Sequence, residues 1–256
     1  MILTDTHTHL YSKDFDPDRT LLIQKAIDNG ITRFFMPNVD DESIPLMFQV
    51  EKQFPDNCFA MMGLHPCSVN STYQKELKVV KHWLGKRKFV AIGEIGIDLY
   101  WDKTFFEQQQ DAFRTQIQLA RQYKLPYIIH SRDSFNEVME IINEFKTGAP
   151  QGIFHCFSGT VKQAEQAIAT GNLKLGIGGV VTFKNSGLDK VVKAIDLKHI
   201  VLETDAPYLT PEPYRGKRNE PDHLLLIAKK IAEIKKISVE EVASITTQNS
   251  IDVFGC

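Results

Sequence analysis

The chain has 256 residues, 43% hydrophobic and 24% charged, which is the composition of an ordinary globular protein and not of a disordered or fibrous one. Its net charge of −2 excludes nucleic-acid binding by bulk electrostatic attraction, so a polyanion would have to meet a local patch or bound metal. Four scattered cysteines argue against a disulfide framework or a thiolate zinc site. Without a signal peptide or membrane-spanning stretch, we expect a cytoplasmic single domain over residues 1–256, with no membrane contact and no obligate protein partner.

Short β-branched or aromatic runs alternate with longer segments of helical periodicity. The expected strands are residues 2–6, 32–36, 59–64, 89–94, 127–130, 152–155, 173–177 and 200–205. The expected helices are residues 16–29, 42–54, 74–85, 104–124, 134–146, 162–170, 186–195, 223–236 and 239–253. Asp16-Pro17 is a start signal for the first helix, and Ser238 with Glu241 forms a capping box for the last.

This alternation is typical of parallel strands joined by right-handed crossovers, which makes the fold class α/β. Eight strands fit a closed (β/α)8 TIM-type barrel better than a doubly wound sheet. A doubly wound sheet stays open as an alternative, although no G-x-G-x-x-G motif follows the first strand.

Histidines and carboxylates gather at the last residue of the expected strands or just after it. This set comprises His7, His9, His65, Glu94, His130, His155 and Asp205. In a (β/α)8 barrel, strand ends of this kind converge on the C-terminal mouth, where such folds keep their active sites. We therefore expect these residues, although scattered in sequence, to be neighbours in space.

Imidazole and carboxylate groups are the ligands of a binuclear site for zinc, manganese or magnesium. A single ion needs about four ligands, so this set exceeds the need of one ion. We expect two divalent metal ions that share Glu94 as a bridge, one held by His7, His9 and Asp205 and the other by His130 and His155. A single His-x-His or strand-end glutamate is commonly structural, whereas the whole set at strand C-termini indicates a metal site.

Six motifs occur in a characteristic order: THTHL, GLHP, GEIGID, HSRD, HCFSG and ETDAPYL. Together they resemble the TatD-type metal-dependent deoxyribonucleases of the amidohydrolase superfamily, from Asp5 to beyond Pro221. The resemblance implies the same six metal positions and a role for His65 near the scissile phosphate. It also implies hydrolysis of DNA, with a preference for single-stranded ends that the near-neutral charge and recessed mouth favour.

The expected mechanism uses a water activated by both ions, with Asp205 as metal ligand and general base. Glu94 and His65 complete the expected catalytic group. Glu203 lies two residues before Asp205 and would point the same way on a strand, so we expect it to orient a metal ligand. A buried carboxylate paired with a base is the other reading of Glu203.

Substrate contacts are expected from residues on the mouth loops. Arg132 follows His130, and Arg215 and Arg218 lie in the densest basic run, after the last strand. Several aromatic residues near the mouth are suited to stacking on unpaired bases. These are Tyr100, Trp101, Phe157, Phe183 and Tyr208, with Tyr100 and Phe157 favoured.

Two other functions remain open. The first is an amidohydrolase-type hydrolase of a small phosphoester, ester or amide, because one barrel hosts many reactions. Glu94 stands where a carbamylated lysine would bridge the metals in some such enzymes, which argues against those. The second is a catalytically silent metal-binding protein, against which the complete ligand set speaks.

Overall fold

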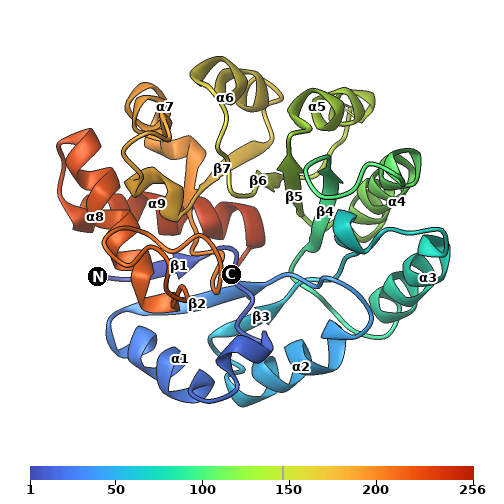
Figure 1. The fold of residues 1–256 in the computed structure, drawn as a ribbon, viewed down its shortest axis with the longest axis horizontal. Coiled ribbons are helices and arrows are strands. Elements are labelled where there is room, and N and C mark those ends of the chain that lie inside the picture. The colour runs from blue at the N-terminus through green and yellow to red at the C-terminus, as the bar shows by residue number, and fades with distance from the viewer. Residues whose placement is uncertain (146) are drawn as a thin grey trace.

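The computed structural model describes residues 1–145 and 147–256, and in these residues short strands alternate with helices (Figure 1). The strands are β1 Leu3–Asp5, β2 Ile31–Met36, β3 Cys58–Ala60, β4 Ile92–Asp98, β5 Tyr127–Arg132, β6 Gly152–Phe154, β7 Leu173–Ile177 and β8 Ile200–Leu202. The α-helices are α1 Arg19–Asp28, α2 Ser43–Gln53, α3 Tyr73–Leu84, α4 Phe106–Tyr123, α5 Phe135–Glu144, α6 Val161–Ile168, α7 Leu188–Ala194, α8 Leu224–Lys235 and α9 Val239–Phe254. None of the helices described combines the length and apolar character that crossing a lipid bilayer requires.

The strands form a closed barrel of parallel neighbours. Two ladders, β1-β2-β3 and β4-β5-β6-β7-β8, contain only parallel pairs. A bridge between Met62, just after β3, and Ile92 joins the first ladder to β4. Just after β1, the N–H of Thr6 donates to the Leu202 carbonyl of β8 at 2.9 Å and closes the ring. Helices surround this ring in Figure 1, and the predicted α/β TIM-type barrel is confirmed.

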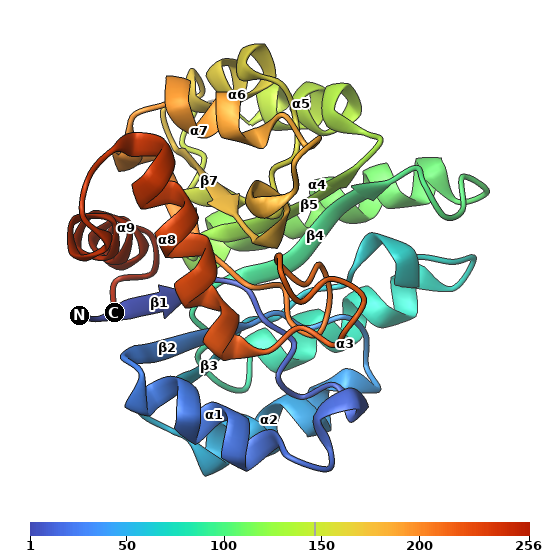
Figure 2. The same ribbon diagram turned by 60° about the vertical axis from the view of Figure 1, so that its left-hand side comes forward.

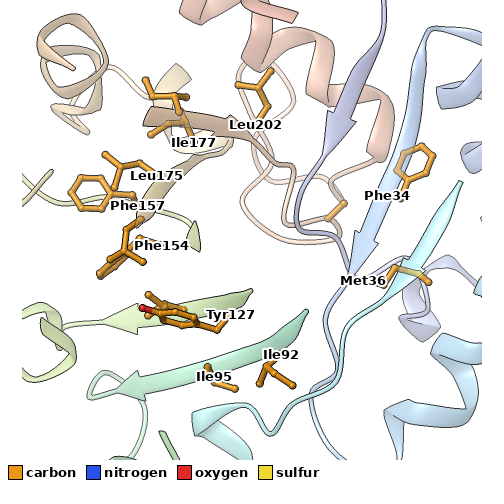
Figure 3. Packing of buried hydrophobic residues seen from close by; sticks show 14 of the residues in the cluster. Phe34, Met36, Ile92, Ile95, Tyr127, Phe154, Phe157, Leu175, Ile177 and Leu202 are labelled. Atoms are coloured by element: carbon orange, nitrogen blue, oxygen red, sulfur yellow. The ribbon is translucent and has the colours of Figure 1, made fainter. Parts of the chain in front are cut away.

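The barrel core has two faces because side chains alternate along each strand. Residues such as Phe34, Leu175 and Leu202 point outward and pack with the helices, and Figure 3 shows these side chains along the strands. A separate cluster points inward at the bottom of the barrel. It contains Phe35, Met61, Ala91, Ile128, Ile153, Val201 and Val253.

Helix α9 closes the N-terminal end of the barrel. Its last turn adds Val253 and Phe254 to the inward cluster, and the Phe254 ring stacks on Phe35 with centroids 3.8 Å apart. The hydroxyl of Thr247 donates to the carbonyl of Ile2, so both chain termini lie at this end, as Figure 2 shows. The opposite, C-terminal mouth is left for the functional residues.

Several predicted boundaries were wrong. Strands β3 and β8 end at Ala60 and Leu202, before the predicted ends at residues 64 and 205, and β4 begins at Ile92 and not at residue 89. Helix α1 begins at Arg19 and not at residue 16, because residues 13–15 form a 3-10 turn before it. Strand β4 runs on to Asp98, four residues beyond the predicted end at Glu94. Ser238 does cap α9, accepting from the N–H of Glu241, but no reciprocal contact completes the predicted capping box. The predicted end of the fifth helix at Lys146 lies outside the described residues.

The long loop after β8 is attached to the start of α1. The Arg218 guanidinium donates to both carboxylate oxygens of Asp18, at 2.9 and 2.6 Å, and to the carbonyl of Asp14. It also lies over the Phe15 ring, 4.9 Å from its centroid. Because Asp18 binds Arg218, its side chain makes no capping hydrogen bond to α1. This ion pair therefore fixes the loop to the segment before α1.

Because Phe35 lies in the middle of the inward cluster, we expect its truncation to destabilise the protein strongly. Phe35 is fully buried, so Phe35→Ala should lower the free energy of unfolding by about 3–5 kcal/mol through lost burial and the cavity left behind. Leu21→Ala is the control because Leu21 is 70% exposed. Urea denaturation of both variants measures the difference, and equal midpoints would contradict this description of the core.

The Asp18–Arg218 pair predicts a pH-dependent contribution to stability. The Arg218 hydrogen bond lowers the pKa of Asp18, so the contribution is present above the ordinary aspartate pKa and is lost as pH falls through the lowered value. Since both side chains are partly exposed, a double-mutant cycle of Asp18→Asn and Arg218→Gln should give a coupling of about 0.5–1 kcal/mol at neutral pH. A coupling of zero at neutral pH would refute the pairing.

Candidate metal centre

The mouth of the barrel is organised around the carboxylate of Glu94, which is buried on β4 and is 2% exposed. Its Oε2 atom faces the first pair of imidazoles, 3.1 Å from His7 Nε2 and 3.8 Å from His9 Nε2. His7 and His9 follow β1 at alternate positions, which directs both Nε2 atoms to the same side. These two nitrogens lie 3.3 Å apart.

The other oxygen of Glu94 faces a second group of imidazoles. Oε1 lies 2.7 Å from His130 Nδ1, 3.5 Å from His65 Nε2 and 3.7 Å from His155 Nε2. These histidines come from β5 and from the segments after β3 and β6. One carboxylate therefore stands between two imidazole groups that reach it from opposite oxygens.

Asp205 adds a second carboxylate beside the first group. Its Oδ1 lies 3.5 Å from His9 Nε2 and 3.8 Å from both His7 Nε2 and His155 Nε2. The Asp205 backbone has a φ of 56°, a left-handed conformation uncommon outside glycine, and its N–H donates to the His7 carbonyl at 2.9 Å. The chain thus turns sharply after β8 and brings this carboxylate to the centre.

Three of these imidazoles have a partner on their outer nitrogen. His9 Nδ1 lies 2.9 Å from the Tyr11 hydroxyl, and His130 Nε2 lies 2.8 Å from Asp98 Oδ2. His155 Nδ1 lies 3.0 Å from Glu203 Oε1, and Gly176 leaves the space that the Glu203 carboxylate fills. Such contacts fix ring orientation and are typical of metal-binding histidines.

Tyr11 and Asp98 are functional candidates that the sequence analysis missed. Asp98 was overlooked because the strand was predicted to end at Glu94, whereas Glu94, Gly96 and Asp98 share one face of β4. The two-residue spacing of the acids in GEIGID was the available signal. Tyr11 had an equivalent signal, two residues beyond His9.

The hydrogen bonds of His65 define its tautomer. Its Nδ1 accepts from the backbone N–H of Cys67 at 3.0 Å, so in the neutral ring the proton is on Nε2. Burial lowers the pKa of His65, which keeps the ring neutral. In this tautomer Nε2 is a hydrogen-bond donor that points into the centre and offers no lone pair to a metal ion, which separates His65 from the other histidines.

The electrostatics of the centre favour positive charge between the carboxylates. Burial opposes ionisation of Glu94, but the imidazoles of His7, His65 and His155 hold its pKa well below its usual range. Burial likewise opposes protonation of His155, yet Glu203, Glu94 and Asp205 raise its pKa to about 10. A divalent cation at this position would replace such protons.

The donor set fits divalent metal ions. Side-chain donor atoms form four groups at the mouth, and within each group these atoms lie within 4.8 Å of one another. These groups are His7 with His9 and Glu94, His7 with His155 and Glu203, His65 with Glu94 and His130, and His155 with Cys156 and Asp205. Residues that would be unfavourable as isolated buried charges are favourable as ligands of cations.

Some of the predicted substrate residues are accessible at the mouth. Tyr100 is 52% exposed, and the Arg132 guanidinium lies 3.8 Å from its ring centroid. Arg215 is exposed and lies over the Phe183 ring at 4.1 Å. These three remain available for contact with a ligand.

Two predicted substrate contacts need correction. Phe157 is 2% exposed and packs against Phe135 and Phe154, so its faces are not open to a base. Arg218 uses its guanidinium to bind Asp18, and its role is to hold the loop after β8. Both residues follow strands on the correct side of the barrel, but packing within the protein occupies them.

Comparisons with known proteins agree with this geometry. The sequence profile described as "TatD related DNase" matches residues 4–255. The chain is 39% identical over 254 residues to an uncharacterized metal-dependent hydrolase of Bacillus subtilis, YabD, with 99% of both chains covered. It is 32% identical over 263 residues to an uncharacterized metal-dependent hydrolase of Mycobacterium tuberculosis, TatD, covering 99% of this chain and 98% of that one. The crystal structure of YJJV, a TatD homolog from Escherichia coli K12, superposes with a TM-score of 0.93 at 29% identity, covering 99% and 98% of the two chains. The resemblance read from the six motifs is thus confirmed, and the chain belongs to the TatD-related DNase family.

Proposed function

We propose that this protein is a metal-dependent deoxyribonuclease that hydrolyses phosphodiester bonds at single-stranded DNA ends, as an exonuclease. The observation that carries the proposal is the position of Glu94, whose two oxygens face two separate imidazole groups. This arrangement suits a carboxylate that bridges two ions. The family match and the metal-dependent hydrolases among the relatives support hydrolysis as the reaction.

His7, His9 and Asp205 would hold one ion, and His130 and His155 the other, with Glu94 shared between them. Divalent magnesium, manganese or zinc at such a site would lower the pKa of a shared water and neutralise charge on the phosphodiester oxygens. The outer partners Tyr11, Asp98 and Glu203 would keep the ligand rings in place.

Side chains around the centre would transfer the proton and contact the phosphate. Asp205 has a side chain that is 12% exposed, at the edge of the centre, where it can take the proton of the attacking water. The Nε2 proton of His65 faces the same space from the other side and can donate to a phosphate oxygen. Arg132, held over Tyr100, supplies positive charge at the rim, and Arg215 supplies more on the loop after β8.

A hydrolase of a small phosphoester, ester or amide is the alternative function. The same ligands would serve it, since one barrel supports several reactions. Exposed Tyr100 and Arg132 beside the centre favour a substrate with bases and phosphates. The overall charge of −2 favours local recognition of a strand end over binding along a duplex.

The direct test is degradation of single-stranded DNA labelled at either end, in magnesium, manganese or zinc and with EDTA. We expect a metal-dependent ladder from one end, which also gives the polarity of attack. Asp205→Asn removes the proton acceptor and should lower the rate by at least about 100-fold while the fold is retained. A fully active Asp205→Asn variant would overturn its assignment, and no cleavage with any metal would favour the small-substrate alternative.

The contact between Glu203 and His155 predicts an effect on metal affinity. Glu203→Gln keeps the shape but removes the charge that orients His155, so metal affinity should fall about 10- to 100-fold. Glu233→Gln, on the exposed side of α8, is the matched control. Calorimetric titration with manganese measures both variants, and unchanged affinity in Glu203→Gln would leave Glu203 without this role.

A further inference from the structure

A cavity of about 190 Å³ lies beside the metal centre, between the segment after β3 and the loop after β4. In Figure 2 these two segments project from the same side of the barrel. Trp101 and Phe105 provide aromatic surface, and Pro66 and Val69 complete the apolar part of the lining. The volume is below the roughly 300–1,000 Å³ of pockets for drug-sized ligands, so it suits a single ring system.

Trp101 is prepared for stacking. It is 69% exposed, although large aromatic side chains are usually buried. Its ring meets Tyr100 edge-on with centroids 4.9 Å apart, and the Arg132 guanidinium lies 5.3 Å from its centroid. These contacts favour one orientation of the ring, and such preorganisation reduces the entropy lost on binding.

The pocket is joined to the metal centre through Asp98. One oxygen of this carboxylate accepts from the N–H groups of Tyr100 and Trp101, at 2.9 and 3.1 Å, and so shapes the loop. The other oxygen lies 2.8 Å from His130 Nε2, and the opposite nitrogen of that ring reaches Glu94. Asp98 is therefore the single residue between a group bound in the pocket and His130 of the candidate metal centre.

The charge of the pocket selects what enters it. Asp98 and Asp102 both line it, and two carboxylates repel a phosphate. A neutral planar ring avoids this repulsion and gains contact with the aromatic surface. The phosphates of a nucleic acid would lie instead toward the metal centre and the Arg132 guanidinium.

We propose that this pocket binds the base of the nucleotide next to the scissile phosphate, stacked on Trp101. The inference deepens the proposed function, on which it rests, by assigning recognition of one base to the loop after β4. Base stacking on an aromatic side chain tolerates different bases, so the pocket favours the presence of a base over its identity.

Fluorescence tests binding independently of catalysis. Trp83 and Trp101 are the two tryptophans of the chain, and Trp83 packs against Phe48 away from the centre. In a Trp83→Phe variant the emission comes from Trp101 and should be quenched saturably by deoxyadenosine but not by 2-deoxyribose 5-phosphate. Phe105→Ala in the same background removes the other aromatic wall and should weaken this quenching. No quenching by the nucleoside, or equal quenching by the sugar phosphate, would overturn the proposal.

Cleavage gives the second readout. Wild-type protein should cleave an oligonucleotide with intact terminal bases about 5- to 150-fold more efficiently than one with abasic terminal positions. Trp101→Ala should lower kcat/KM on the intact substrate to the abasic level, whereas Tyr214→Ala, an exposed aromatic on another loop, should keep the preference. Equal wild-type rates on both substrates would refute the pocket. Nucleoside quenching without cleavage of either oligonucleotide would refute the proposed function while supporting the pocket.

Discussion

The burial of the Glu94 carboxylate is the constraint on which the mouth of this barrel depends. An isolated buried carboxylate is strongly unfavourable, and it becomes acceptable only with positive charge or hydrogen-bond donors around it. Here the partners come from the segments after β1, β3 and β6 and from β5, which converge only when the ring of strands is closed. The charge on one side chain thus links the geometry of the barrel to the chemistry of its mouth.

The same constraint extends outward from the centre. Each ring that meets Glu94 must present the correct nitrogen, and Tyr11, Asp98 and Glu203 set this orientation for three of them. His65 differs because a backbone N–H holds its Nδ1, which leaves a proton on the nitrogen that faces the centre. A hydrogen bond from the main chain therefore separates a proton donor from the candidate metal ligands that surround it.

Much of the barrel, and the proximity of the candidate metal ligands, was predictable, because both depend on local pattern. Strand periodicity indicated where the strands lie, and the rule that parallel strand ends share one mouth predicts that His7, His130 and Asp205 are neighbours. The C-terminal end of β4 was harder to predict from the sequence, because the glycines of GEIGID weaken the strand signal where the strand continues to Asp98.

The other errors concern partners that are distant in sequence. Arg218 lies 200 residues from Asp18 in the sequence, so no local sequence pattern predicts their ion pair. The burial of Phe157 depends on aromatic neighbours, such as Phe135, that reach it from another βα unit. Loop residues at a barrel mouth can face a ligand or the protein itself, and the sequence alone does not distinguish these environments.

Helix α9 closes the N-terminal end of the barrel, and this position affects the order in which the chain folds. Contacts such as that of Thr247 with Ile2 join positions 245 residues apart, so they close almost the largest loop that this chain can make. Closing such loops costs chain entropy before the buried contacts compensate for it, and folding rates fall as contacts become less local. Until α9 docks, Phe35 lacks the ring that stacks on it at the floor of the barrel. We therefore expect the strands and outer helices to assemble first, and the docking of α9 to limit the rate of the final folding step.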